Sequence, residues 1–185
     1  LVYDAEDGIW KPGEGGGGGG GGITLLYQRA WSGTPGLTGL IDAIGTNDGV
    51  DAYVNPSPSI VTASQSTDQD GTRTAHKAFD HANTTNSETH TTNVANSWWQ
   101  VDFRDYRVAL TRVGLWNRLE SGQHPRTFKI QGSEDGISWT DLLTVSNPSS
   151  AEGTWWTGEI TSTTLWSHVR VLQTGTNTSG WNYLV

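Results

Sequence analysis

Apolar and polar residues alternate most regularly in the middle of the chain. In Ser97–Phe103, the apolar residues Trp99, Val101 and Phe103 occupy every second position. This period of two predicts a strand with one buried face, because successive side chains of a strand point to opposite sides. The run Thr127–Gln131 alternates in the same way, through Phe128 and Ile130. We expect the apolar side chains of both strands to share one interior.

A turn follows the second run. Asp135 and Gly136 are a hairpin signal, because glycine takes the positive φ that a tight turn needs. Further runs with strand character are Ile23–Trp31, Ile60–Ser64, Val108–Trp116, Leu142–Val145, Trp155–Ile160 and His168–Leu172. Short strands separated by turns, without a helical period of useful length, predict an all-β sandwich or jelly roll.

Two of these segments carry a family pattern. The strand Trp98–Phe103 and the hairpin Gly132–Trp139 resemble the W-x-Q-V-D-L and GS-x-DG-x-x-W motifs of discoidin domains, also called coagulation factor 5/8 type C domains. Ile60–Ser64 is similar to the V-T-A-S strand that opens many of them. The resemblance implies a discoidin-like jelly-roll β-sandwich over residues 59–185, and a galactose-binding-like fold.

The residues before this domain divide into three segments. Residues 1–14 have two short apolar runs around a turn, which predicts a small hairpin. Residues 15–22 are an oligoglycine tether, and residues 23–58 are a strand followed by an irregular connection. The hairpin resembles a short module of bacteriophage fibre and appendage proteins. An isolated hairpin before a linker is the alternative.

Composition and charge narrow the classes of partner. The net charge is −8 and the 11 Lys and Arg residues form no cluster, so a nucleic-acid ligand is excluded. No apolar run approaches the roughly 18 residues of a membrane helix, and we expect no membrane insertion. Ten Trp predict an aromatic core, and the absence of Cys excludes a disulfide framework. Because the chain contains no Met and ends in the strand-like Tyr183–Val185, we expect a segment of a longer polypeptide.

Catalytic motifs are absent from the sequence. It has no G-x-S-x-G, no H-E-x-x-H and no catalytic Cys. Glu134 and Asp135 lie in the predicted turn, where we expect them to shape the turn. For Asp102, on a strand among aromatic residues, the resemblance implies a structural hydrogen-bonding role. The sequence therefore predicts a protein that is not an enzyme.

A structural calcium ion is the cofactor to consider. The resemblance implies a loop of the type A-x-D-G-x-x-x-T-x-W, and Ala78-Phe79-Asp80 matches its start. His81 replaces the glycine, which leaves Asp80 as the best candidate ligand. The five histidines have no zinc-ligand spacing, and we expect scattered surface imidazoles. They are His76, His81, His90, His124 and His168.

The resemblance also implies where a ligand binds. In this family the loops at one end of the sandwich contact ligands, and here they would include Gln65–Thr74, Asn117–His124 and Gln173–Asn182. An aromatic ring can pack on a sugar while polar side chains bond to its hydroxyls. The candidate ligand-binding residues are Arg118, Glu120, His124, Asn177, Trp181 and Asn182. The alternative is that Trp116 and Trp181 are core rings in ordinary turns.

Together these features predict a non-enzymatic virion protein, a fibre or appendage subunit. The hairpin and glycines would join other virion subunits, with a homotrimer favoured, and the β-sandwich would meet host-surface glycans or neighbouring subunits. Two alternatives stay open: a carbohydrate-binding module of a secreted glycosidase, which would be extracellular, and a purely architectural capsid or tail protein. Burial of the loops around Arg118 and Trp181 at subunit contacts would favour the architectural protein.

Overall fold

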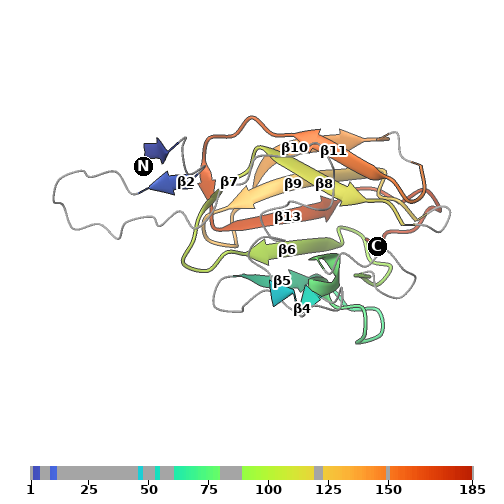
Figure 1. The fold of residues 1–185 in the computed structure, drawn as a ribbon. Coiled ribbons are helices and arrows are strands. Elements are labelled where there is room, and N and C mark those ends of the chain that lie inside the picture. Colours follow the sequence, from blue (N-terminus) through green and yellow to red (C-terminus); the bar gives the residue numbers. More distant parts are fainter. Residues whose placement is uncertain are drawn as a thin grey trace.

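The computed structural model describes residues 2–4, 9–11, 46–47, 53–54, 61–79, 89–118, 123–148 and 151–184. Within these ranges the elements are strands, apart from one short 3-10 helix (Figure 1). In chain order they are β1 (Val2–Asp4), β2 (Ile9–Lys11), β3 (Thr46–Asn47), β4 (Tyr53–Val54), β5 (Thr62–Gln65), η1 (Ala75–Phe79), β6 (Trp98–Asp102), β7 (Val108–Ala109), β8 (Arg112–Trp116), β9 (Thr127–Ser133), β10 (Thr140–Ser146), β11 (Trp155–Glu159), β12 (Leu165–Trp166) and β13 (His168–Gln173).

One sheet of five antiparallel strands forms the larger layer, in the order β10-β9-β13-β6-β5. Strand β13 lies between the two strands that carry the sequence motifs, β6 and β9. In this register Val169 pairs with Val101 of β6, and Val171 pairs with Ile130 of β9. Segments that are far apart in the chain therefore place their apolar residues side by side.

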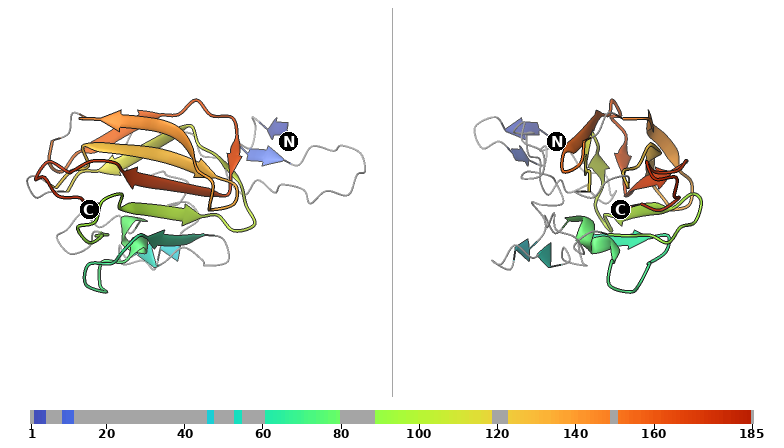
Figure 2. Two further views of the ribbon diagram at one scale, coloured as in Figure 1. Left: turned by 180° about the vertical axis from the view of Figure 1, so that it is seen from behind. Right: turned by 90° about the vertical axis from the view of Figure 1, so that its right-hand side faces the viewer.

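The second layer consists of the pairs β8–β11 and β7–β12. In Figure 1 this layer lies in front, and the view from behind in Figure 2 shows the five-stranded sheet. The molecule is a jelly-roll β-sandwich, as the sequence predicts, because each sheet has one apolar face to bury.

The core confirms the prediction of a shared interior. Phe128 and Ile130 belong to one buried cluster, and Val101 and Phe103 belong to a second. Trp99 packs against both clusters and so joins them. The five alternating apolar side chains thus meet inside the sandwich.

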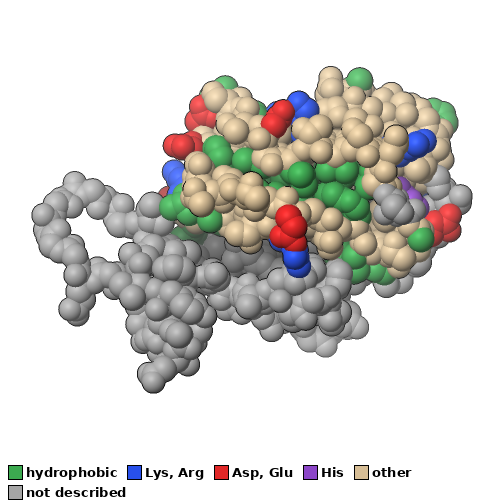
Figure 3. Space-filling view, turned by 90° about the horizontal axis from the view of Figure 1, so that it is seen from above, with side chains coloured by type: hydrophobic (Ala, Val, Ile, Leu, Met, Phe, Trp, Pro, Cys, Tyr) green, Lys and Arg blue, Asp and Glu red, His purple; other side chains and the backbone are tan. Residues whose placement is uncertain are grey.

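Among the described strands, β10 and β11 are edge strands of the two layers. Within the described ranges, β10 pairs only with β9, and β11 pairs only with β8. Figure 3 shows hydrophobic side chains in a band between two polar ridges on this side of the molecule. A register shift between Asp141 and Leu143 bends β10, and such bulges discourage further strands from adding to a free edge.

Two segments differ from their predicted form. The run Val108–Trp116 is divided into β7 and β8, because the two pieces pair with different strands, β12 and β11. The polar stretch between β5 and β6 contains η1, which the sequence pattern does not reveal. Strands β1 and β2 pair where a hairpin is predicted. The oligoglycine run 15–22 and the predicted strand Ile23–Trp31 lie outside the described residues.

Candidate ligand-binding site

One end of the sandwich gathers the loops that the sequence predicts as the ligand face. Strands β5 and β13 end there, β6 and β9 begin there, and the C-terminus lies beside them (Figure 1). Antiparallel pairing causes this grouping, because neighbouring strands run in opposite directions. The described parts of these loops are 66–74, 89–97, 117–118, 123–126 and 174–184.

An open depression of about 360 Å³ lies among these loops. Its lining residues are Gln69, His90, Thr91, Thr92, Asn93, Trp181 and Tyr183. Trp181 is 49% exposed and lies nearly parallel to the ring of Tyr183, with a centroid distance of 6.4 Å and an interplanar angle of 13°. Tyr183 also contacts His90, with ring centroids 4.5 Å apart. The depression therefore has an aromatic wall that ends in an exposed indole.

Backbone hydrogen bonds hold the three lining segments together. The backbone N–H of Gln69 donates to His90 O (3.2 Å), and His90 N–H donates to Arg73 O (3.1 Å). On the other side, Thr91 N–H donates to Leu184 O (3.1 Å), and Leu184 N–H donates to Thr91 Oγ1 (2.9 Å). The shape of the depression is fixed by these bonds before any ligand binds.

Two side-chain amides at the depression have fixed orientations. Gln69 Oε1 accepts from Arg73 Nη1 at 2.8 Å, and Asn93 Oδ1 accepts from the backbone N–H of Asn182 at 2.8 Å. Because a guanidinium and a backbone N–H can only donate, the oxygen of each amide must face the protein. The amide nitrogens, which only donate, take no part in these two bonds.

Two histidines depart from the prediction of surface imidazoles. His90 and His124 are each 4% exposed, so the prediction is wrong for them. A backbone carbonyl satisfies each ring: His90 Nδ1 lies 2.6 Å from Thr91 O, and His124 Nε2 lies 3.0 Å from Arg118 O. Spacing along the chain does not reveal such backbone partners.

The two predicted loops around Arg118 and Asn177 meet at this end. His124 O accepts from Thr178 N–H at 3.1 Å, and a β-bridge joins Pro125 to Asn177. The Arg118 guanidinium donates to Gln123 Oε1. Three of the predicted residues, Arg118, His124 and Asn177, are thus brought together.

Asn177 has a structural role in this geometry. It is 2% exposed, and its Oδ1 accepts from the backbone N–H groups of Ser179 and Trp181, both at 3.0 Å. Its own backbone N–H donates to Trp181 O at 2.7 Å. Asn177 therefore positions Trp181 and does not face the depression.

The other predicted residues divide between the depression and segments that lie outside the described residues. Trp181 lines the depression, and Asn182 adjoins it through its bond to Asn93. Glu120 and Asp80 lie outside the described residues. Within the described ranges, no three His, Asp or Glu side chains come together as metal ligands. Asp80 as a calcium ligand stays a prediction.

Several lining residues were missed by sequence reasoning. Gln69 lies in the predicted loop Gln65–Thr74 but is not among the predicted ligand-binding residues. The same holds for the lining residues His90, Thr91, Thr92, Asn93 and Tyr183. Tyr183 had a usable signal, because it follows Trp181 by two residues and an extended chain points both side chains to one side. For the 89–93 segment we find no such signal in its polar sequence.

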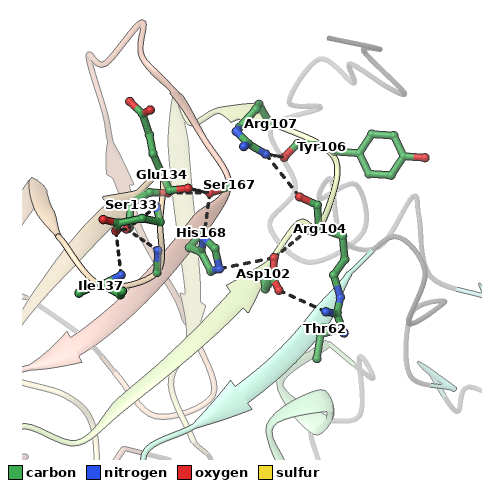
Figure 4. A network of polar contacts seen from close by, with 12 residues as sticks. Thr62, Asp102, Arg104, Tyr106, Arg107, Ser133, Glu134, Ile137, Ser167 and His168 are labelled. Atoms are coloured by element: carbon green, nitrogen blue, oxygen red, sulfur yellow. Dashed lines mark hydrogen bonds and ion pairs between the residues drawn. The ribbon is translucent and has the colours of Figure 1, made fainter. Parts of the chain in front are cut away.

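A Ser-His-Asp arrangement occurs at the opposite end of the sandwich (Figure 4). Ser167 Oγ lies 2.8 Å from His168 Nδ1, and His168 Nε2 lies 3.5 Å from Asp102 Oδ1. However, Ser167 is 2% exposed, and its hydroxyl donates to Glu134 O at 2.6 Å. A nucleophile needs access to substrate and a base for that proton. The Ser167 hydroxyl instead links the hairpin after β9 to the start of β13.

Asp102 takes part in this structure as expected. Its Oδ1 accepts from Arg104 N–H at 2.7 Å, which confirms the predicted hydrogen-bonding role. Within the part of the chain that the structure describes, no helix has the length and apolarity that a membrane crossing requires.

Comparisons with known proteins agree with this architecture. A family model described as an F5/8 type C, NedA-like, galactose-binding domain matches residues 69–171. No curated protein sequence matches the chain. Among solved structures, the family 32 carbohydrate-binding module of Clostridium perfringens NanJ in complex with galactose is 14% identical, with a TM-score of 0.53, covering 66% of this chain and 88% of that one.

Two further structures share the fold. CpGH89CBM32-5 from Clostridium perfringens, in complex with GalNAc-β-1,3-galactose, is 14% identical, with a TM-score of 0.52 and coverage of 68% of this chain and 95% of that one. A fucolectin from striped bass (Morone saxatilis) serum is 24% identical, with a TM-score of 0.56 and coverage of 67% of this chain and 43% of that one.

Proposed function

Since the chain belongs to the family of F5/8 type C, NedA-like, galactose-binding domains, we propose that it is a non-enzymatic carbohydrate-binding module with its sugar site in the depression beside Trp181. The observation that carries the proposal is the exposed Trp181 ring next to two amide groups of fixed orientation. The family match supports the ligand class, and the geometry supports the place.

The Trp181 ring would hold the apolar face of a sugar. Asn177 holds the backbone of Trp181, and the indole stacks with Tyr183, so the ring is supported before a sugar binds. Rigid aromatic side chains contribute contact area with little loss of conformational freedom. A pyranose lying on the indole would keep its hydroxyls at the rim, beside Gln69 and Asn93.

The amides would select the polar groups of the sugar. Gln69 Nε2 and Asn93 Nδ2 are donors, so they suit oxygen acceptors such as hydroxyl lone pairs, a ring oxygen or an acetamido carbonyl. Among the described residues, the lining includes no Asp, Glu, Lys or Arg. We therefore propose a neutral sugar as ligand, bound with an affinity that changes little with salt.

The setting of the module is a further part of the proposal. We favour a carbohydrate-binding module of a secreted glycosidase, and hence an extracellular location, over a virion fibre subunit. The structural relatives support this order, because one of them is a module from a family 31 glycoside hydrolase of Clostridium perfringens. Virion partners and a homotrimer rest on the residues before the sandwich, and the architectural alternative rests on burial of the loops around Arg118 and Trp181 at subunit contacts. All three stay predictions.

The test compares the intact chain with variants at the depression. Trp181→Ala is expected to lower the affinity for galactose about tenfold, the effect of losing about 1.4 kcal/mol of ring contact. Asn93→Asp is the more specific test. The new carboxylate can still accept from Asn182 N–H, but the amide donor proposed to face the ligand is lost. We expect weaker galactose binding in calorimetry with an unchanged melting temperature.

Ile137→Ala is the matched control. Ile137 is 82% exposed in the hairpin after β9, at the other end of the sandwich, so this variant should bind like the wild type. If Trp181→Ala bound galactose with wild-type affinity, the depression would not be the sugar site. Failure of the intact chain to bind any sugar on a glycan array would overturn the proposed function.

A further inference from the structure

A second exposed aromatic surface lies outside the depression, on the outer face of the β8–β11 pair. In this register Trp155 pairs with Trp116, Thr157 pairs with Gly114, and Glu159 pairs with Arg112. The alternate residues Val113, Leu115 and Trp156 pack against the core. Because side chains alternate across a strand, the first set must face outward.

The ring of Trp155 is the centre of this surface. Trp155 is 36% exposed and meets Trp116 edge-on, with centroids 5.3 Å apart and an interplanar angle of 65°. Its six-membered ring reaches over Gly114, where an added Cβ would lie 3.4 Å from Cε3. The glycine leaves room for the indole to lie against the sheet, supported from the side by Trp116.

Polar groups continue the surface along the two strands. The exposed Thr157 follows Trp155 on the same face, and the ion pair between Arg112 and Glu159 comes next. Rows of side chains on one face repeat about every 7 Å. Like the depression, this surface combines an exposed aromatic ring with hydrogen-bonding side chains, but here the polar groups are a hydroxyl and an ion pair.

This surface adjoins the end of the sandwich that carries the depression. Asn117 N–H donates to Thr154 O at 2.9 Å, and Gly153 N–H donates to Asn117 O at 3.0 Å. These bonds tie the start of β11 to the loop of Arg118, which His124 joins to the segment before Trp181. The two aromatic surfaces are thus linked through one set of packed loops.

We propose that Trp155 and its neighbours form a second sugar-contact surface, which binds a further unit of a longer glycan. The proposal rests on the proposed carbohydrate-binding function. A sugar suits this surface because its one exposed ring is small and has hydrogen-bonding groups beside it: 36% of a tryptophan of about 250 Å² is about 90 Å².

The test uses galactose and β-1,4-linked galactohexaose with the intact chain. Trp155→Ala is expected to lower the affinity for galactohexaose about three- to tenfold, the range of a single aromatic contact. Its affinity for galactose should stay at the wild-type value. Trp155→Phe keeps a flat ring and should retain most of the hexaose affinity. In the wild type, the indole N–H signal of Trp155 should shift in NMR when galactohexaose is added.

The outcomes separate this inference from the proposed function. Equal hexaose affinity in Trp155→Ala and the wild type, with no shift of the Trp155 signal, overturns the second surface and leaves the depression intact. Absence of binding of both sugars to the wild type overturns both. A change of oligomeric state in Trp155→Ala, measured by sedimentation, assigns the surface to a subunit contact and also overturns the inference.

Discussion

Gly132 lies directly beneath the indole of Trp166. A Cβ at this position would come 2.5 Å from Trp166 Cδ2, well inside the contact distance of two carbon atoms. Trp166 is 7% exposed and is enclosed by the core, so it has little room to move away. The glycine of the GS-x-DG-x-x-W motif is therefore required by the close approach of a ring to the backbone of β9.

Gly132→Ala is expected to lower the free energy of unfolding by about 1–3 kcal/mol, the cost of overpacking a core. Urea denaturation measures the change. Gly114→Ala is the matched control, because a Cβ there would make ordinary contacts of 3.4 Å or more. Equal stability of Gly132→Ala and the wild type would mean that the indole of Trp166 moves aside freely.

At the candidate site, the sequence could point to individual residues but not to their partners. Trp181 stands out as an aromatic residue in a polar loop, and it lines the depression. Asn177 has the same loop composition around it, yet it is buried and holds Trp181 in place. His90 approaches Tyr183 only through the fold, since the two are far apart in the chain. Burial and partnership of polar residues depend on tertiary contacts that local pattern does not contain.

The hairpin between β9 and β10 is organised by one carboxylate. Asp135 Oδ1 accepts from the backbone N–H groups of Ser138 (2.7 Å) and Ile137 (2.8 Å), and from Ser133 Oγ (3.0 Å). These bonds, led by the one from Ser138, lower the pKa of Asp135 from 3.8 to about 2. Gly136 follows with a φ of 71°, which confirms the predicted turn.

Asp135→Asn is expected to remove a pH-dependent part of the stability. The pKa is lower in the folded state, so the unfolded chain takes up the proton first as the pH falls. The stabilisation is therefore complete above about pH 4 and is lost as the pH falls toward about 2. In urea denaturation, Asp135→Asn should be less stable than the wild type at neutral pH, and the difference should close below about pH 3.

Glu134→Gln provides the control for this experiment, because Glu134 is the neighbouring exposed carboxylate of the same hairpin. It should follow the wild-type pH profile. A constant difference between Asp135→Asn and the wild type from neutral pH to pH 2 would contradict the assignment of the low pKa to this turn.

Strands could be predicted where apolar and polar residues alternate along the chain. In β6 and in the first part of β9, the buried residues alternate with less buried ones, so a period of two in their sequence identifies them. The break between β7 and β8 has no such signal, because Leu110 continues the apolar run. There the chain changes partner from β12 to β11, and Thr111 O accepts from Ile160 N–H at 2.9 Å. The choice of partner is a property of the whole sandwich.

At the scale of the molecule, the sandwich is self-contained among the described residues. Every buried residue of the two core clusters lies between Val61 and Leu184. Strands β1 to β4 pair only as β1–β2 and β3–β4 and add no strand to the described sheets. The C-terminal segment follows β13 of the five-stranded sheet. Hydrogen bonds between Leu184 and Thr91 hold this segment at the depression. Folding and ligand binding should therefore reside together in the predicted domain 59–185.

A chain of residues 59–185 alone should fold and bind galactose like the intact chain. Its melting temperature should lie within about 2–4 °C of the intact value, the shift that 1 kcal/mol produces in a protein of this size. Calorimetry of both chains measures stability and affinity together, and Trp181→Ala in the short chain shows whether binding uses the same depression. A fall of more than about 10 °C would mean that residues 1–58 stabilise the sandwich by several kcal/mol. Loss of galactose binding at unchanged stability would instead assign part of the ligand site to those residues, because the described lining residues are all retained in the short chain.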